Sequence, residues 1–435
     1  MDRIEATERT VDDFLRDQGM HVEALEMESA TGEFLAEMER GLAGERSSLQ
    51  MIPTYVELDG AAPSDRPVVV IDAGGTNFRV ATVRFDAEGA PVVKRLARFE
   101  MPGVREPIGV TAFFERIALY VGKNIDDSDR VGFCFSYPSE IFPSHDGRLL
   151  RFCKEVRAKE VEGQIIGERF NAAIAGAGHD RKHIVLLNDT VATLLAGKSL
   201  SNRPYGGYIG FILGTGTNCS YIESNRRIGK IAGIDPERQQ IINVESGSFA
   251  GIRRGTVDLR FDARTTDPGE YTFEKMISGG YLGELARELL IAATQAGLLS
   301  EGFTRGLQAL AHLETREVGA FLASPTATGD TFARTASEDD LLTIYLLIDR
   351  LVERAAKLTA VNLSSVILRS GCGPDPTRPV CITAEGSTFF GLPTLRERID
   401  YYLRAYLVRE KRRHYEFVQI DNATLIGAAI AGLTN

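Results

Sequence analysis

Two glycine-rich turns in this sequence combine backbone amides, hydroxyl groups and a carboxylate in a way that suits an anion. The first lies in VVVIDAGGTNFRV, residues 68–80, and the second in YIGFILGTGTNCSYIE, residues 208–223. Each turn stands between two apolar runs that predict strands. The residues that carry this chemistry are Asp72, Gly74, Gly75, Thr76 and Asn77 in the first turn, and Gly214, Thr215, Gly216 and Thr217 in the second.

These turns can bind phosphate because glycine leaves backbone N–H groups unshielded and accepts positive φ. The side chains of Thr76, Asn77, Thr215 and Thr217 add donors. Asp72, at a strand end, can hold Mg²⁺ directly or through water. The alternative for either turn alone is an ordinary tight hairpin. However, the triplet Gly-Thr-Asn recurs 141 positions later, which favours a repeat of whole domains whose two turns clamp a polyphosphate.

The surroundings of both turns exclude two common nucleotide-binding motifs. The chain has no G-x-x-x-x-G-K-[ST] loop, and the residues after each turn predict a strand where a dinucleotide-binding loop would open a helix. We therefore expect an α/β protein with two actin-like (ribonuclease-H-like) lobes around a deep ATP-binding cleft.

A third constellation, Asn188-Asp189, ends the apolar run HIVLL, residues 183–187, and leads into a predicted helix. A helix cap is the ordinary role for such residues. Yet α/β proteins place their sites at strand ends, where the Asp189 carboxylate could accept the proton of an attacking hydroxyl.

Polar side chains also interrupt apolar stretches elsewhere in the chain. Gathered in one pocket they could bind several hydroxyl groups of a sugar, although each taken alone could equally lie on a solvated face. They are Ser136, Lys154, Asn218, Glu245 and Glu274.

The remaining pattern positions these residues. We expect helices at 11–44, 274–299, 340–367 and 425–433, strands at 68–71 and 78–85, and a further strand in 380–387. The chain of 435 residues is long enough for two or three domains.

Composition limits the partners and the compartment. The net charge of −10 argues against nucleic acid and acidic membrane surfaces, and no apolar run is long enough to span a membrane. Five cysteines without a C-x-x-C pair favour free thiols in a reducing cytoplasm. The acidic N-terminus suits neither a secretory signal nor a transit peptide, which favours the same compartment. Small-molecule partners are expected, and a homodimer stays open.

Eight collinear motifs resemble those of the eukaryotic-type hexokinase family, in its single-unit form. They are SSLQMIPTYV, DAGGTNFRV, FSYPSE, NDTVATLLAG, LGTGTNCSYIE, INVESGSF, DPGEYTFEKMISGGYLGEL and AEGSTF. The family's fold implies a large lobe of residues 1–65 and 188–420 and a small lobe of residues 66–187 and 421–435, which close on glucose.

The resemblance also implies roles for individual residues. Asp189 matches the family's catalytic base and Lys154 its cleft lysine, while the two glycine turns match its ATP-phosphate loops and Gly386 and Ser387 its adenosine motif. Our candidates for water-mediated Mg²⁺ contacts are Asp72 and Asp189. The residues that match sugar ligands are Ser136, Asn188, Asp189, Asn218, Glu245 and Glu274.

Four positions depart from the family pattern. Phe152 and Ser246 stand where the family usually has tryptophan, Cys153 replaces a sugar-contacting threonine, and Glu385 replaces an aspartate. The loss at Cys153 could broaden sugar specificity. None of the four removes the base, the lysine or the phosphate loops.

The function that we expect is ATP-dependent phosphorylation of the 6-hydroxyl of glucose and related hexoses, with Mg²⁺. The alternatives are a catalytically silent sugar sensor on the same scaffold and an actin- or chaperone-like ATPase. The sequence leaves open the preferred hexose, donors other than ATP, the oligomeric state and regulation.

Overall fold

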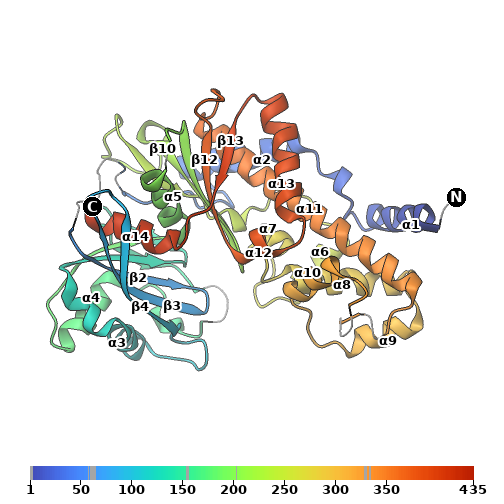
Figure 1. The fold of residues 1–435 in the computed structure, drawn as a ribbon, viewed down its shortest axis with the longest axis horizontal. Coiled ribbons are helices and arrows are strands. Elements are labelled where there is room, and N and C mark those ends of the chain that lie inside the picture. The colour runs from blue at the N-terminus through green and yellow to red at the C-terminus, as the bar shows by residue number, and fades with distance from the viewer. Residues whose placement is uncertain are drawn as a thin grey trace.

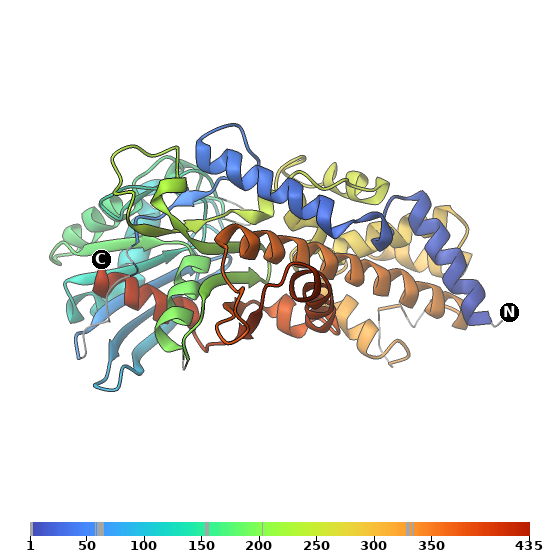
Figure 2. The ribbon, with the colours of Figure 1, turned by 90° about the horizontal axis from the view of Figure 1, so that it is seen from above.

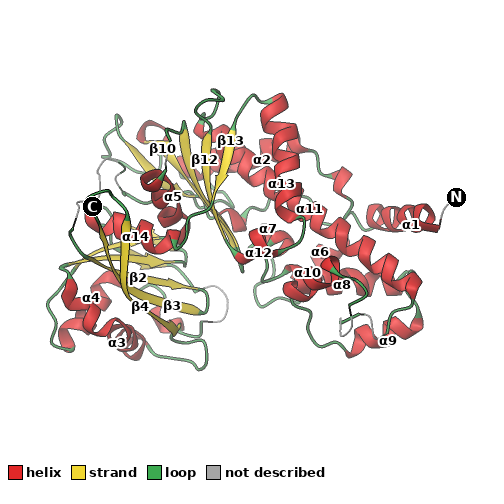
Figure 3. Ribbon diagram, viewed as in Figure 1, coloured by secondary structure: helices red, strands yellow, loops and turns green. Residues whose placement is uncertain are grey.

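The computed structural model describes residues 3–56, 58, 65–152, 156–201, 203–327, 331–332 and 335–435. Two β-sheets occupy one half of the elongated molecule, and helices dominate the other half (Figures 1 and 3). Within the described ranges, no helix is long and apolar enough to cross a membrane.

The first sheet has five strands in the order β4-β3-β2-β5-β8. Strands β2 and β3 form an antiparallel hairpin, β4 continues it, and β5 and β8 run parallel to β2. The strands are β2 (Val68–Gly74), β3 (Asn77–Phe85), β4 (Pro91–Glu100), β5 (Arg130–Phe135) and β8 (His183–Leu187).

Alternate side chains of β2 enter two different cores, because successive residues of a strand point to opposite faces. Val69 and Ile71 pack with α3 (Val110–Val121) and α4 (Ile166–Gly176). Val68 and Val70 pack in the core that contains α5 (Asp189–Leu200) and α14 (Ala423–Thr434). We call this sheet, with α3, α4 and α14, the small lobe.

The second sheet repeats the arrangement of the first. Its order is β1-β11-β10-β9-β12-β13, in which β9, β10 and β11 form an antiparallel meander and β12 and β13 run parallel to β9. The predicted domain repeat is therefore present, with β1 as an added edge strand. The strands are β1 (Ile52–Pro53), β9 (Gly207–Leu213), β10 (Thr217–Ser224), β11 (Gln239–Asn243), β12 (Val380–Glu385) and β13 (Tyr415–Val418).

Helices α5 and α14 cross closely between the two sheets (Figure 1). A Cβ atom on Gly427 of α14 would lie 1.7 Å from the Ala192 carbonyl oxygen of α5. Only glycine permits this approach. The crossing joins the C-terminal helix of the small lobe to α5, which belongs to the lobe of the second sheet.

The helical body extends the second sheet's lobe toward the N-terminal end of the molecule (Figure 2). We call the second sheet and this body, with α5, the large lobe. Its longest element is α11, whose 33 residues begin with a capping box at Ser337 and end before Gly371, which has φ 72°. The helices of the body are α1 (Arg3–Asp17), α2 (Met27–Ala43), α6 (Thr256–Asp262), α7 (Thr272–Ile277), α8 (Leu282–Gln295), α9 (Glu301–Ala309), α10 (Thr315–Ala323), α11 (Glu338–Ser370), α12 (Ser387–Gly391) and α13 (Leu395–Leu403).

Two predicted helices are each divided in the structure. The segment 11–44 contains α1 and α2, and the chain leaves α1 at Gly19, where φ is 67°. The segment 274–299 breaks between α7 and α8. There the N–H groups of Gly279 and Gly280 bind the carbonyl oxygens of Gly214 and Thr215 at 2.8 and 2.9 Å, so they are unavailable to a helix. The predicted helices at 340–367 and 425–433 and the predicted strands are confirmed.

Candidate active site

The two glycine-rich turns line one cavity of about 580 Å³ between the sheets. The first turn follows β2 and the second follows β9, which is the equivalent strand of the other sheet, so the repeated topology brings the turns to equivalent places. The cavity also receives side chains from β3, β4, β12 and α14. Its lining residues are Asp72, Gly74, Gly75, Thr76, Asn77, Arg79, Arg98, Ser136, Asp189, Ile212, Gly214, Thr215, Gly216, Glu385, Gly386, Ser387 and Thr424.

Glycine is required in the first turn and at Gly386, which packs against the strand before the second turn. Gly75 has φ 57°, and a Cβ on Gly74 would lie 2.8 Å from the Ser136 hydroxyl oxygen. Gly386 has φ 120°, and a Cβ there would lie 2.2 Å from the Leu213 carbonyl oxygen. These contacts place the second turn against the residues that begin α12.

Asp72 is 5% exposed and lies opposite Arg79 on the neighbouring strand. Its Oδ2 accepts a hydrogen bond from Arg79 Nε at 2.9 Å and another from the Thr424 hydroxyl at 3.0 Å. Sequence reasoning identified Asp72 but missed both partners. Arg79 could have been predicted from the register of the hairpin. A turn that pairs Gly74 with Asn77 also pairs residue 72 with residue 79.

A second arginine, Arg98, pairs with Arg79 across β3 and β4 and lines the same cavity. Arg98 has no local signal in the sequence, because its strand is joined to the hairpin by a separate turn. Together Arg79 and Arg98 bring positive charge to the side of the cavity formed by the first turn.

Asp189 is the first residue of α5, and Asn188 is its N-cap. The Thr190 N–H binds Asn188 Oδ1 at 2.9 Å and Asp189 Oδ1 at 2.8 Å. The capping role considered from sequence is therefore real for Asn188. Asp189 in addition lines the cavity beside the two turns, where its half-buried carboxylate faces the same space as Ser136.

Four of the predicted sugar-binding residues surround the N-terminal end of β10. Asn218 Nδ2 donates to Asn188 Oδ1 and to Glu245 Oε1, each at 3.4 Å, and to Asn243 Oδ1 at 2.8 Å. Asn243 in turn donates to Glu245 Oε1 at 2.8 Å. Asn243 was missed, although it lies two residues before Glu245 at the end of β11.

Glu274, the fourth of these residues, lies on α7 and is buried. Its Oε2 accepts a hydrogen bond from the Thr217 N–H at 2.8 Å. The Thr217 hydroxyl donates to the Ile212 carbonyl oxygen at 3.0 Å. Both donors of Thr217 thus bind protein atoms, and a phosphate contact by Thr217 stays a prediction.

Lys154 and Cys153 lie outside the described residues. The structure therefore places every other predicted site residue and leaves the position of the cleft lysine open.

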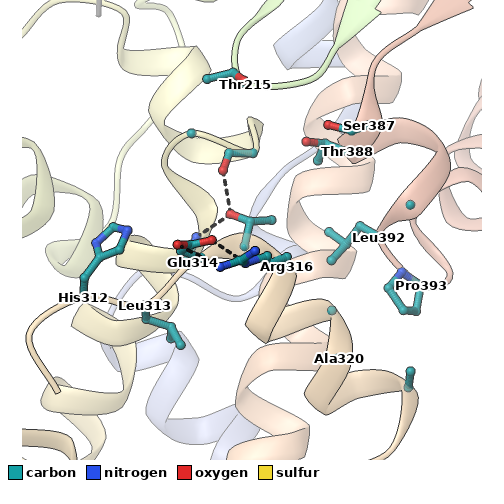
Figure 4. Close-up of a pocket in the computed structure, with 17 residues that line it drawn as sticks. Thr215, His312, Leu313, Glu314, Arg316, Ala320, Ser387, Thr388, Leu392 and Pro393 are labelled. Atoms are coloured by element: carbon teal, nitrogen blue, oxygen red, sulfur yellow. Dashed lines mark hydrogen bonds and ion pairs between the residues drawn. The ribbon is translucent and has the colours of Figure 1, made fainter. Parts of the chain in front are cut away.

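A second cavity of about 760 Å³ adjoins the first, and Thr215 and Ser387 line both (Figure 4). Ser387, Thr388, Leu392 and Pro393 lie on one side of it, and His312 and Leu313 on the other (Figure 4). Glycine and alanine form much of the wall, which leaves room for a flat ring. These small residues are Gly279, Gly280, Gly283, Gly319, Ala320, Ala323 and Gly391.

The carboxyl group of Glu385 lines the first cavity. Burial and, after it, the negative charge of Asp72 raise its pKa to about 7, although the Arg79 guanidinium opposes both. Oε1 accepts a hydrogen bond from the Ala423 N–H, at the N-terminus of α14, at 3.1 Å. Glu385 therefore connects the large lobe to the C-terminal helix of the small lobe.

The comparisons with known proteins agree with this geometry. Two family models, both described as Hexokinase, match residues 11–199 and 208–434. Hexokinase-1 of Oryza sativa subsp. japonica is 29% identical over 434 residues, which cover 91% of this chain and 84% of that protein.

Solved structures share the fold. The hexokinase from Schistosoma mansoni complexed with glucose has a TM-score of 0.83 and 24% identity, with 99% of this chain and 100% of that chain covered. A ROK family glucokinase from Streptomyces griseus in complex with glucose and AMPPNP has a TM-score of 0.52 and 16% identity, with 85% and 100% covered. The chain thus has the two-lobed α/β hexokinase fold, and by the match of its sequence it belongs to the hexokinase family.

Proposed function

We propose that this hexose kinase transfers the γ-phosphoryl group of ATP to the 6-hydroxyl of glucose and related hexoses, with Asp189 as the general base. The observation that carries the proposal is the single cavity that holds both glycine-rich turns and the Asp189 carboxylate. The donor phosphates and the accepting hydroxyl can meet only in such a place.

The two adjoining cavities suit the parts of ATP. The triphosphate fits the first cavity, where backbone N–H groups of the turns and the cations Arg79 and Arg98 face its oxygens. The nucleoside fits the second cavity, past Gly386 and Ser387. The S. griseus protein, which was solved with an ATP analogue, supports ATP as the donor.

The hexose would bind where amide and carboxylate groups gather beside Asp189. Asn188, Asn218 and Glu245 are already joined by hydrogen bonds, and Glu274 is held by the second turn. Amide and carboxylate groups supply the kinds of donor and acceptor that a set of sugar hydroxyls needs. Ser136 and Asp189 complete the predicted set of sugar ligands, whereas Lys154 is the predicted cleft lysine that steadies the transferred phosphoryl group.

Asp189 would accept the proton of the 6-hydroxyl as its oxygen attacks phosphorus. Its place at the N-terminus of α5 presents the carboxylate to the cavity that both turns line. The donor set fits magnesium, because the carboxylates of Asp72 and Asp189 face the phosphate space and Mg²⁺ prefers oxygen ligands. Bound Mg²⁺ would neutralise phosphate charge.

We assign residues 66–187 and 421–435 to the small lobe and residues 1–65 and 188–420 to the large lobe. The support is that the first sheet packs against α14 in one hydrophobic core and against α3 and α4 in another. Closure of the lobes on the sugar would exclude water from the phosphoryl group. The cytoplasmic location and the homodimer stay predictions.

The test is glucose 6-phosphate formation by the purified protein with Mg·ATP. The Asp189→Ala variant should lose roughly 10²- to 10⁴-fold in kcat, which is the usual contribution of a general base. Its affinity for glucose should change little. Asp180→Ala, which alters an exposed aspartate, is the matched control and should keep wild-type turnover.

Near-wild-type kcat in Asp189→Ala would refute the assignment of the base. Absence of turnover in the wild-type protein, with glucose binding retained in calorimetry, would favour the sugar-sensor alternative.

A further inference from the structure

Arg151 joins the two lobes at the sugar-binding side of the cleft. It follows β7 (Gly147–Leu149) in the small lobe, and its guanidinium reaches the large lobe. Nε donates to the Tyr271 hydroxyl at 2.9 Å, while Nη1 and Nη2 both donate to Glu270 Oε2 at 3.0 Å. The guanidinium carbon also lies 4.6 Å from the centre of the Tyr271 ring. One side chain thus makes three hydrogen bonds and a cation–π contact across the lobes.

The residues that Arg151 binds lie directly before α7, the short helix that presents Glu274. Tyr271 is its N-cap, and Glu274 is its third residue. Tyr271 is 7% exposed and has φ 48°. A bulky residue in this left-handed region is uncommon and persists only where its surroundings enforce it. The contact with Arg151 is one such restraint.

The other end of the same segment is fastened inside the large lobe by Lys275. This buried ammonium group donates to Asp262 Oδ1 at 2.7 Å, to the Thr265 hydroxyl at 2.8 Å and to the Asp267 carbonyl oxygen at 2.7 Å. The segment 262–275 is therefore held from within by Lys275 and from across the cleft by Arg151. Glu274 lies between these two anchors in the chain.

Stability alone does not explain the interaction of Arg151 with Glu270. The two side chains are 37% and 53% exposed, and exposed ion pairs contribute little to folding. Because the interaction between Arg151 and Glu270 spans the cleft, it restrains both the separation of the lobes and the start of α7. A planar guanidinium is suited to this double role, since it can stack on Tyr271 while it donates to Glu270.

We propose that Arg151 is a positioning residue for the hexose. By binding Glu270 and Tyr271 across the cleft it holds Glu274 in place and favours the closed arrangement of the lobes, and it thereby sets the affinity for the sugar. This inference rests on the proposed sugar site, and it assigns to Arg151, Glu270 and Tyr271 a role in sugar binding without direct contact with the sugar.

The test compares Arg151→Ala with Arg226→Ala, which removes a more exposed arginine–glutamate pair elsewhere on the large lobe. Calorimetry of the full chain with glucose, mannose and fructose gives the dissociation constants, and steady-state kinetics give KM for the hexose and for ATP. Arg151→Ala should weaken hexose binding roughly fivefold, the effect of losing about 1 kcal/mol of interaction. Its KM for ATP should stay within about twofold of wild type. Arg226→Ala should change neither quantity.

Charge reversal supplies the second measurement. Arg151→Glu should weaken hexose binding more than Arg151→Ala, and the double variant Arg151→Glu/Glu270→Arg should recover part of the loss. Thermal midpoints of Arg151→Ala and Arg226→Ala should be alike, which separates positioning from general stability.

Two results would overturn the proposal: hexose affinity of Arg151→Ala within twofold of wild type, or no recovery in the double variant. A wild-type protein that binds none of the three hexoses would instead refute the proposed function on which this inference rests.

Discussion

Substitution of Glu385 by glutamine should change how the stability of the protein depends on pH. The carboxyl group lies at the end of β12, where burial is the largest of the causes that raise its pKa from an ordinary value of 4.5 to about 7. Asp72 and Asp189 add to this effect through their negative charge. Glutamine keeps the shape of the side chain and an oxygen for the Ala423 N–H, but it cannot ionise.

The sign and the magnitude of the change in the free energy of unfolding follow from the protonation of Glu385 in the folded and unfolded states. In the unfolded chain Glu385 loses its proton near pH 4.5, whereas in the folded protein it keeps the proton until about pH 7. The folded state therefore binds more protons in this interval, and the free energy of unfolding falls as pH rises through it. A difference of 2.5 pH units corresponds to about 3 kcal/mol lost by pH 8.

Urea unfolding between pH 4.5 and 8.5 measures this loss directly. Wild type and Glu385→Gln should have similar stability at pH 4.5, and the variant should be more stable by about 3 kcal/mol at pH 8. Glu385→Asp, which restores the family's usual residue and still ionises, should keep the fall seen in wild type. KM for ATP should also rise with pH in wild type more than in Glu385→Gln, because an ionised Glu385 repels the triphosphate.

A stability difference between wild type and Glu385→Gln that stays constant from pH 5 to pH 8 would refute this reasoning. It would mean that the carboxyl group is ionised throughout, with Arg79 as its dominant neighbour.

Two further predictions concern packing and buried charge. In α2, Gly32→Ala should stabilise the protein by about 1 kcal/mol, since a Cβ there meets nothing within 4 Å. Gly41→Ala in the same helix should destabilise it by about 1 to 3 kcal/mol, because its Cβ would lie 2.5 Å from the Leu49 carbonyl oxygen; equal effects in urea unfolding would contradict this. Arg354→Met should cost about 3 to 5 kcal/mol by leaving the buried Asp258 carboxylate, now bound at 2.6 and 3.0 Å, without its partner. Arg354→Met/Asp258→Asn should be more stable than the single variant, and a double variant that is less stable would refute the explanation.

Local sequence pattern was sufficient for the strands and for the repeat because these depend on neighbouring residues. The continuous apolar runs of β2 and β9, each of which ends at a glycine-rich turn, identify the two hairpins. The matching strand order of the sheets then explains why the same triplet recurs. Helix ends were harder to predict. The division between α7 and α8 depends on hydrogen bonds from Gly279 and Gly280 to the second turn, which is about 65 residues away in the chain.

The site residues also differ in whether the sequence around them carries a signal. Asp72 and Asp189 stand at strand ends, where the pattern alone makes a buried carboxylate unusual, so both could be identified. Arg151 could not, because an arginine beside an apolar run is ordinary until its partners are known. Those partners, Glu270 and Tyr271, lie more than 100 positions away and in the other lobe. A residue that works by joining the lobes has no signature in its own neighbourhood, and for that reason exchange of charges between Arg151 and Glu270 is a stronger test of its role than any single substitution.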